Sequence, residues 1–537
     1  MNKQLTCRSL LLPIFLSFSY FLPAQGPKYY GGDPAKKLDW TLYYLDAYYS
    51  DSVDKERLAE LAIIKVLKEL DPYSGYQSKI QLEKQRKRDK GQKNDGLGFR
   101  YYIINDTATI NHIDKGSPGE LAGIRKGDKI LSVDGTNTVG KNFDLIDKKL
   151  LARSGRVVSL SLHRKKPSRS VNIDIISREL SEPSIDAAYM ISSGTGFIKL
   201  NRFTQKTRRE FFEAINDLKS RGMQQLILDL RNNRGGVVRG AIALADEFLP
   251  PGQLIMYSEG KGMGKETFIS TSGGSFEKGK LVLLVNGATA SSSEIISAAL
   301  QEWDRALLIG EMTYGKGLIQ QSYLLSDSSA VRLTIGRYFT PTGRMLQRPY
   351  KFEQSKDWLF QNLKASVNQN GFTAHMEIPD SLQWETKGGR RVLQGKGGLV
   401  PDIFMSGKTR KNPQVSALKN KGLLYRFTAF HADKFRREYR EKFSDGYAFT
   451  EDEKIDKKIA DDLVSFLGGR LEPSETPDWL KTQTISKAVI TQIKAWVGPQ
   501  IWETGTYYAV INEEDEQVRR AIECLSDNTF NQLGLKY

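Results

Sequence analysis

Cysteine is nearly absent from this chain of 537 residues, which contains only Cys7 and Cys524. Cys7 lies in an N-terminal segment that we expect to be removed, so one cysteine would remain. A single cysteine cannot form an internal disulfide. The fold must therefore depend on its hydrophobic cores. At about 150 residues per domain, the length allows roughly three or four domains.

Histidine is almost as scarce as cysteine, and none of the histidines stands in a glycine-rich or polar constellation of the sequence. This argues against a catalytic Ser-His-Asp triad, and we expect no metal site and no cofactor. The chain contains four histidines: His112, His163, His375 and His431.

Long hydrophobic runs are also missing, since no segment after residue 25 approaches the 18 apolar residues of a membrane-spanning helix. Residues 1–25 differ from the rest. Lys3 and Arg8 precede an apolar stretch at 10–21, and Leu22-Pro-Ala24 follows it. This layout predicts a signal peptide over 1–24 and a mature protein in the periplasm or cell envelope. An uncleaved anchor is the alternative.

Acidic residues are outnumbered, with 63 Asp and Glu against 79 Lys and Arg and a net charge of +16. Such a charge can attract nucleic acids or anionic surfaces. The basic residues are scattered, with clusters only at 84–93 and 164–166, and export argues against a nucleic-acid partner. We expect the positive charge to keep the protein soluble and to attract it to acidic surfaces of the cell envelope. Peripheral envelope association and a homo-oligomer both stay open.

The patterning divides the mature chain into four regions. Residues 25–90 carry helical apolar periodicity that stops at Asp71-Pro72, and residues 91–178 are rich in short β-runs separated by turns. The β-runs are 101–104, 108–113, 129–133, 157–162 and 170–175. A turn is expected at 116–119, a short helix at 120–124 and a hairpin turn at Asp134-Gly135.

Residues 179–408 alternate buried strands with amphipathic helices, which predicts an α/β layered domain with parallel pairing. Residues 409–537 are mostly helical, and Trp479, Trp496 and Trp502 indicate an apolar core there. In the α/β region the expected strands are 196–200, 225–230, 280–285 and 306–309, and the expected helices are 207–219, 237–248 and 292–301.

Two residues could act as a nucleophile and its base without a histidine. Ser291 opens an apolar helical pattern, and Lys316 stands between two glycines in Tyr314-Gly-Lys-Gly317. A serine needs a base within hydrogen-bond reach. A lysine can serve as that base if burial lowers its pKa from about 10.4. The plain alternatives are a helix cap at Ser291, in the capping box Ser-x-x-Glu294, and a solvated turn lysine.

A glycine pair adds a third element to this pattern. Gly235-Gly236 ends the segment Asp229-Leu-Arg-Asn-Asn-Arg-Gly-Gly236, which follows a buried strand and enters a helix. Consecutive glycines let backbone amides approach a developing oxyanion closely. The alternatives are an ordinary strand–helix turn and a phosphate cradle, for which the usual glycine-lysine motifs are lacking.

Together these segments resemble the carboxyl-terminal processing (tail-specific) serine protease family over about residues 30–405. The resemblance rests on 229–236, Thr289-Ala-Ser-Ser-Ser-Glu294, Tyr314-Gly-Lys-Gly317 with Gln320, and Arg337-Tyr-Phe-Thr-Pro-Thr-Gly343, with Leu70-Asp-Pro-Tyr-Ser74 and Gly397-Gly-Leu-Val-Pro-Asp402. The β-rich module resembles a PDZ domain, with Gly96-Leu-Gly-Phe99 in place. Two departures are Ser292, where alanine is frequent, and Arg234, where proline is frequent.

The resemblance implies a ClpP/crotonase-like layered protease core at 179–408, an inserted PDZ-like module at 91–178, and helical regions at 25–90 and 409–537. It implies Ser291 as nucleophile, Lys316 as general base and Gln320 as the residue that orients the lysine. On a straight strand, positions 316 and 320 would be about 13 Å apart, so this contact needs a bend. The oxyanion donors would be the amide of Ser292 and that of Gly235 or Gly236.

The PDZ-like module implies that protein or peptide substrates are selected by their free C-termini, which such modules bind as an added strand. Leu97, Gly98 and Phe99 would form the binding loop, and Arg100 could attract the carboxylate. The function expected is an exported serine endopeptidase. The alternatives are a non-catalytic or latent PDZ scaffold, a module that only braces the N-terminal helices, and an acyl-transfer or hydratase-like enzyme acting on thioesters.

Overall fold

The computed structural model describes residues 33–104, 106–165, 168–350, 383–393, 397–406, 412–450, 452–468 and 484–537. The predicted signal peptide, His375 and Trp479 lie outside these residues. The chain forms two compact units that divide after Val66, and each is treated by itself. The first contains α1 (Pro34–Tyr48) and most of α2 (Lys55–Lys68), and no side chain of α1 is buried. No described helix is both long and apolar enough to cross a membrane.

The α/β region is built on a sheet whose central strands are buried on both faces. Among the described residues this sheet has six strands in the order β10-β11-β12-β15-β16-β21, and all neighbours except the edge pair β10–β11 are parallel. The parallel pairing predicted for this region is confirmed. The strands are β10 (Ile185–Ser192), β11 (Thr195–Leu200), β12 (Gln225–Asp229), β15 (Leu281–Val285), β16 (Leu307–Gly310) and β21 (Ile403–Phe404).

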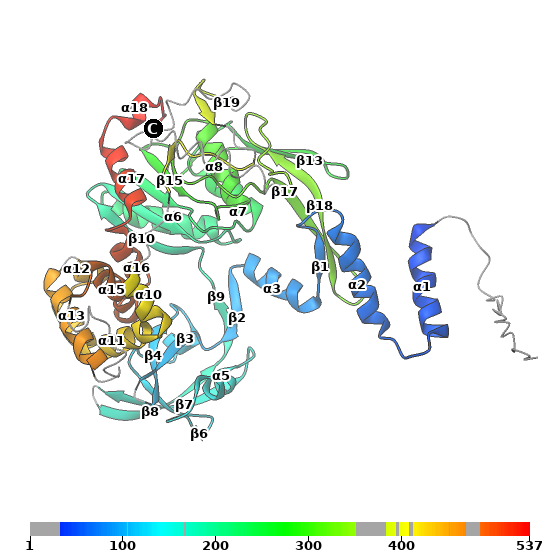
Figure 1. Ribbon diagram of the computed structural model, residues 1–537. Coiled ribbons are helices and arrows are strands. Elements are labelled where there is room, and N and C mark those ends of the chain that lie inside the picture. Colours follow the sequence, from blue (N-terminus) through cyan, green and yellow to red (C-terminus); the bar gives the residue numbers. More distant parts are fainter. Residues whose placement is uncertain are drawn as a thin grey trace, which may run out of the picture. The chain divides into compact units, whose positions relative to one another are not determined.

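Each face of this sheet has its own helical cover (Figure 1). On one face, Leu226 and Leu228 belong to a core with α6 (Thr207–Ser220), α7 (Val238–Asp246) and α8 (Ser292–Glu302). On the other, Ile227 belongs to a core with the chain's last helices. Those helices are α16 (Gly505–Asn512), α17 (Glu516–Ser526) and α18 (Thr529–Gln532). Cys524 is a free, buried cysteine in the second core.

A second, antiparallel sheet was not predicted from the sequence. Its described strands follow the order β1-β18-β13-β14, and β17 also pairs with β18. The strands are β1 (Gly75–Gln77), β13 (Leu254–Gly260), β14 (Gly264–Ile269), β17 (Leu318–Leu324) and β18 (Ala330–Phe339); a short described pair joins β19 (Gln383–Glu385) to β20 (Arg391–Leu393).

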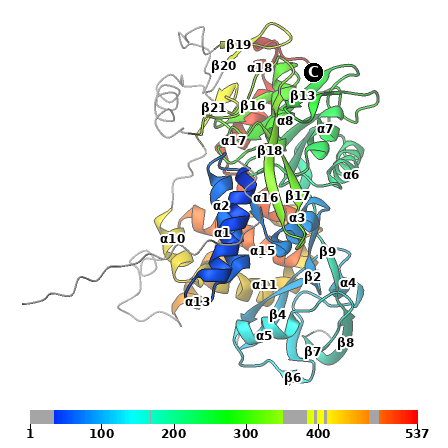
Figure 2. The same ribbon diagram turned by 90° about the vertical axis from the view of Figure 1, so that its right-hand side faces the viewer.

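The β-rich module follows α3 (Lys79–Asp89), and Figure 2 shows it beside α11 (Leu423–Lys442) and α15 (Lys487–Ile501). The five predicted β-runs are confirmed as β3, β4, β5, β7 and β8, and the Asp134-Gly135 turn joins β5 to β6. The elements are β2 (Gln92–Gly96), β3 (Phe99–Ile104), β4 (Thr107–Ile113), α4 (Pro118–Leu121), β5 (Lys129–Val133), β6 (Thr136–Asn137), α5 (Phe143–Leu150), β7 (Val157–Lys165), β8 (Ser168–Ile176) and β9 (Arg178–Ser181).

One boundary in the module was predicted wrongly. The sequence placed a turn at 116–119 and a helix from 120, but the helix begins at Pro118. The Ser117 side chain accepts a hydrogen bond from the Glu120 amide and so caps the helix. A proline at the first helical position needs no hydrogen-bond partner for its nitrogen, so Ser-Pro starts a helix here and does not make a turn.

The described residues after 411 are mostly helical, as predicted. Its first part has a core of its own, to which Phe427, Leu463 and Ile493 belong, with Trp502 packed against it. The helices of this part are α10 (Pro413–Asn420), α11 (Leu423–Lys442), α12 (Gly446–Thr450), α13 (Glu453–Gly468) and α15 (Lys487–Ile501).

Candidate active site

Three loops meet at the carboxyl ends of three neighbouring parallel strands. The loop after β12 carries the glycine pair, the loop after β15 carries Ser291, and the loop after β16 carries Lys316. Parallel strands present all their carboxyl ends at one edge of the sheet, so loops far apart in sequence become neighbours there. The structure thus brings together the serine, the lysine and the glycines singled out in the sequence.

Ser291 has an uncommon backbone conformation for a residue with a side chain. Its φ is 56° and its ψ is −116°, immediately before α8 begins. A non-glycine residue with positive φ is held there by its surroundings at a cost in free energy, and such residues cluster at functional sites. The Ser291 N–H donates to Glu294 Oε2 at 2.8 Å, which is one arm of the capping box expected from the sequence.

Glu294 joins the serine loop to the lysine loop. This side chain is fully buried, and burial raises its pKa while its hydrogen bonds act in the opposite direction. Its Oε2 accepts from the amides of Ser291 and Lys316, at 2.8 and 2.9 Å. Its Oε1 accepts from Thr313 Oγ1 at 2.6 Å and from the Gly315 amide at 2.7 Å. The sequence indicated Glu294 only as a capping residue, and its role across the two loops was missed.

Lys316 lies in a partly enclosed position. Burial lowers the pKa of its ammonium, and the positive charge of Arg332 lowers it further, while Glu294 and Asp71 act in the opposite direction. Lys316 Nζ donates to Gln320 Oε1 at 2.9 Å. The bend that this contact requires is present, because the register of β17 on β18 shifts between Ile319 and Gln320.

The glycine pair lies against the serine loop. A side-chain carbon at Gly235 would stand 3.0 Å from Ser291 Cβ and 2.9 Å from the Ser292 nitrogen, so only glycine fits. Its φ of 89° also favours glycine. The Gly235 N–H donates to Asn233 Oδ1 at 2.9 Å. Ser292 Oγ donates to the Gly236 carbonyl at 3.0 Å, so the serine that departs from the family pattern joins the two loops.

Tyr338 is a further link that the sequence did not reveal. Its hydroxyl lies 3.3 Å from the Ser291 carbonyl and within hydrogen-bonding distance of the Lys316 carbonyl. The side chain is fully buried, and burial raises its pKa well above the usual value. A neutral phenol from β18 thus holds the backbone on both sides of the site.

A buried ionic network holds the start of the glycine loop, where the loop leaves β12. Asp229 ends β12 and is bound by Lys199 at 3.0 Å and by Arg231 at 2.7 Å. Burial alone would raise the pKa of Asp229, but Lys199 and Arg231 lower it to about 2. Arg231 also binds Asp515 at 2.6 Å, which ties the loop to the start of α17.

The proposed tail-binding loop lies at the start of β3, an edge strand of the module sheet. Leu97 is buried, Phe99 is half-buried and Arg100 is exposed. Gly98 has a φ of 77°, and a side-chain carbon there would overlap Ser117 Cβ at 2.1 Å. The Leu97 carbonyl accepts from the Gly119 amide at 2.7 Å, and the Gly98 carbonyl accepts from the Asp114 amide at 2.8 Å.

One histidine does belong to a polar constellation, contrary to the sequence analysis. His431 is fully buried and binds Asp462 through Nδ1 at 2.7 Å and Tyr439 through Nε2 at 2.8 Å. The prediction was wrong because His431 and Asp462 lie on different helices, 31 positions apart. With both ring nitrogens engaged, neither is left to activate a serine.

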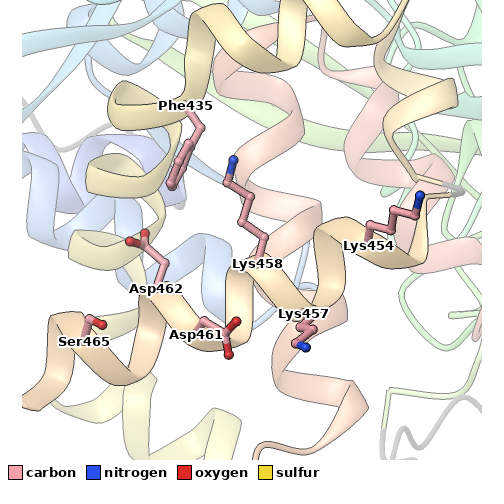
Figure 3. Close-up of a pocket in the computed structure, with 7 residues that line it drawn as sticks. All are labelled: Phe435, Lys454, Lys457, Lys458, Asp461, Asp462 and Ser465. Carbon is pink, nitrogen blue, oxygen red and sulfur yellow. The ribbon is translucent and has the colours of Figure 1, made fainter.

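A cavity of about 440 Å³ lies beside this network (Figure 3). Asp462 already binds His431 and Lys434, and Lys458 already binds Glu438. Asp462 and Lys458 are therefore committed to ion pairs, and we do not assign the chemistry to this cavity. Its lining residues are Phe435, Lys454, Lys457, Lys458, Asp461, Asp462 and Ser465.

Two family models match parts of this chain. The model of peptidase family S41 matches residues 194–351, and a PDZ domain model matches residues 109–164. A carboxy-terminal-processing protease of Bartonella bacilliformis is 30% identical over 298 residues, which cover 55% of this chain and 68% of that protein. A probable CtpA-like serine protease of Staphylococcus aureus (strain N315) is 31% identical over 317 residues, 58% of this chain.

The match spans 62% of the length of that Staphylococcus protein. Among solved structures, the photosystem II D1 C-terminal processing protease is 25% identical, with a TM-score of 0.36. That match covers 70% of this chain and 87% of the solved chain.

Proposed function

The chain belongs to peptidase family S41, and we propose that it is an exported serine endopeptidase that cleaves proteins selected by their C-terminal tails. The observation that supports this most strongly is the convergence on Glu294. One buried carboxylate accepts hydrogen bonds from the amides of both Ser291 and Lys316, while Gly235 packs against the same serine. We propose Ser291 as the nucleophile and Lys316 as the general base.

The lowered pKa of Lys316 favours the neutral amine that a base requires. In the first step, neutral Lys316 takes the proton of Ser291 Oγ as the oxygen attacks the carbonyl carbon of the substrate. Gln320, which accepts a hydrogen bond from Lys316 Nζ, would orient the amine. The resulting lysinium then protonates the leaving amine, and the peptide bond breaks to leave an ester on Ser291.

In the second step, Lys316 takes a proton from water as the water oxygen attacks the ester. The proton returns to Ser291 Oγ when the acid product leaves. In both steps the oxyanion would be stabilised by the amide of Ser292, at the start of α8, and by the amide of Gly235 or Gly236. Gly235 is the glycine in contact with Ser291.

We propose that the PDZ domain selects the substrate. A tail would pair with β3, an edge strand of the module sheet, and its carboxylate would be held by the loop Leu97-Gly98-Phe99, with Arg100 supplying positive charge nearby. The expected partners are proteins or peptides with free C-termini in the periplasm or cell envelope.

A latent form is the second candidate, and one observation favours it. The Gly235 N–H donates to Asn233 Oδ1, so this amide would have to exchange its partner before it could bind an oxyanion. A latent enzyme would hydrolyse an internal site only after a tail peptide binds. A scaffold without chemistry would bind tails and hydrolyse nothing.

The test is cleavage of an unstructured peptide with an apolar C-terminus, with a free or an amidated terminus. Wild type is expected to cleave the free-tail peptide faster, and Ser291→Ala and Lys316→Ala to lose roughly 10³-fold or more in kcat/KM. Ser220→Ala, at an exposed serine that ends α6, is the matched control. Equal turnover in all variants would exclude the dyad, and turnover only after addition of a second tail peptide would indicate the latent form.

A further inference from the structure

A short turn that precedes the β-rich module contacts the lysine site from the opposite end of the sequence. This turn comprises residues 71–74 and lies between α2 and β1. Asp71 Oδ1 accepts from the amides of Tyr73 and Ser74 at 2.7 and 2.8 Å, and Ser74 Oγ donates to Asp71 Oδ2 at 2.7 Å. An aspartate that binds its own following amides makes a defined turn.

The turn is fixed to the second sheet on its far side. β1 pairs with β18, with Gly75 opposite Arg332, and the Thr334 amide donates to Ser74 Oγ at 3.1 Å. β17, which carries Gln320, pairs with the same strand. The strand after the turn and the strand after the lysine loop therefore both pair with β18.

The carbonyl of Tyr73 accepts from two side chains that act on Lys316. Gln320 Nε2 donates to it at 2.7 Å and Arg332 Nη2 at 3.2 Å. A glutamine amide has a donor end and an acceptor end. With Nε2 committed to Tyr73, Oε1 must face Lys316 Nζ, where it accepts at 2.9 Å. Reversing the amide would set N–H groups against the N–H groups of the lysine.

The ring of Tyr73 covers the amine itself. Lys316 Nζ lies 5.1 Å from the centre of this ring. The ring excludes water from the amine, which disfavours the charged ammonium form and lowers the lysine pKa. The π-face of the ring also attracts the ammonium, which favours the charged form and raises the pKa. At a desolvated site the attraction is worth about 2 kcal/mol, or roughly 1.5 pKa units, whereas burial can lower a lysine pKa by up to several units. We therefore expect the ring to lower the pKa of Lys316, because the exclusion of water outweighs the attraction.

We propose that Tyr73 is a positioning residue of the Ser291–Lys316 site: its carbonyl fixes Gln320 and Arg332, and its ring shields the Lys316 amine from water. This inference rests on the proposed function, because it assigns Tyr73 to the base of that reaction. Among the described residues, the charged or titratable groups that face Lys316 are Asp71 and Tyr73 itself on the turn, Glu294 on α8 and Arg332 on β18.

The experiment compares wild type, Tyr73→Ala and Tyr73→Phe across pH. In Tyr73→Ala water reaches the amine, and we expect the acid limb of kcat/KM to move up by about one pH unit, with about tenfold less activity on that limb. Tyr73→Phe keeps the ring and the carbonyl and should keep the wild-type limb within about 0.3 units. Tyr323→Ala, at an exposed tyrosine of β17, is the matched control.

A second measurement separates this inference from the proposed function. The rate at which acetic anhydride acetylates Lys316, followed by mass spectrometry of the Lys316 peptide against pH, gives the lysine pKa without any turnover. An upward shift in Tyr73→Ala supports the inference even if no peptide is cleaved. Arg332→Gln removes the positive charge that lowers the Lys316 pKa, so it should shift the titration upward whether or not Tyr73 acts, and it calibrates the measurement. Tyr73→Thr, a less drastic truncation of the ring, covers the case in which Tyr73→Ala does not fold. An unchanged titration in folded Tyr73→Ala or Tyr73→Thr, or a loss of kcat without a shift of the acid limb, would overturn the proposal.

Discussion

The side chain of Glu294 is the residue on which the geometry of the site depends. It has no exposed surface, and its two oxygens accept four hydrogen bonds, three of them from backbone amides. A carboxylate offers about four lone-pair positions, so its capacity is filled. Because the Ser291 and Lys316 amides share Oε2, the spacing of these two backbone positions is fixed by one atom.

Glu294→Gln tests this dependence. A glutamine replaces one acceptor oxygen by an NH2 group, which would face either the amides of Ser291 and Lys316 or the donors of Thr313 and Gly315. We expect kcat/KM to fall by about 100-fold and the free energy of unfolding to fall by about 2–4 kcal/mol, since buried donors lose their acceptor. Peptide cleavage and urea unfolding measure the two effects. Glu213→Gln, at an exposed glutamate of α6, should change neither, and wild-type kinetics in Glu294→Gln would contradict this role.

At the scale of elements, the close approach of the glycine loop to the start of α8 sets the site. A methyl group at Gly235 would lie 2.8 Å from the Ala290 carbonyl oxygen and 2.9 Å from the Ser292 nitrogen, so the two loops would separate. Gly222, after α6, has a similar φ of 87° but nothing within 4 Å of the same methyl position. Comparing substitutions at Gly235 and Gly222 therefore separates the effect of the contact with the serine loop from the effect of backbone strain.

Gly235→Ala is expected to lower kcat by about 100-fold, the cost of losing one oxyanion donor. Gly222→Ala should pay only the strain of positive φ, about 1 kcal/mol of stability, and keep its kcat. Steady-state kinetics with thermal unfolding of both variants gives the comparison. Equal losses of kcat in the two would show that strain, and not the contact with Ser291, is responsible.

The parallel sheet could be predicted because its strands are buried on both faces. Leu281–Val285 reads as one apolar run, and the helices between such runs have a clear apolar side. The second sheet gave no such signal, since β17 exposes most of its residues and reads as a mixed polar segment. The sequence also could not show the bulge beside Gln320, which decides whether this residue reaches Lys316.

The residues proposed for the reaction could be indicated from sequence because each stands in a distinctive local pattern. Glu294, Tyr338 and Tyr73 stand in segments that carry the resemblance, but their roles could not be indicated, because their contacts join segments that only the fold brings together. Tyr338 meets Lys316 from 22 positions away and Tyr73 meets Gln320 from 247 positions away. Periodicity and spacing carry no information over such separations.

At the scale of the whole molecule, the helices after residue 411 contact the PDZ domain through cations. Lys126 Nζ donates to the carbonyls of Pro499, at 2.8 Å, and Trp502, at the end of α15. Arg436 of α11 donates to the Gln500 carbonyl at the same helix end, and Lys165 binds Asp433 at 2.5 Å. Carbonyls at a helix C-terminus lack partners within the helix and attract positive charge.

The pKa of Lys126 makes this contact depend on pH. Burial, with Arg436 and Arg440 nearby, lowers that pKa from 10.5 to about 7. Between these values the unfolded chain holds a proton that the folded chain lacks, so the free energy of unfolding rises with pH. The slope is at most about 1.4 kcal/mol per pH unit, and below pH 7 the contribution is constant.

Lys126→Met should therefore remove part of the rise in stability between about pH 7 and pH 9.5. Urea unfolding at several pH values, followed by tryptophan fluorescence, gives the difference between variant and wild type. Lys115→Met, at an exposed lysine of the same domain, is the control and should follow the wild-type curve. Curves for Lys126→Met that run parallel to wild type would contradict the assignment.

The positive φ of Ser291 has a consequence for how the chain can change over evolutionary time. Glycine would adopt this conformation without the cost that serine pays, of order 1–3 kcal/mol. In a lineage that only needed to bind the C-terminal tails of other proteins, selection for stability would therefore favour glycine at this position. A serine that is kept at this position in spite of its cost in stability indicates a requirement of the chemistry and not of folding. Its replacement by glycine would be an early sign that a descendant had ceased to be a hydrolase.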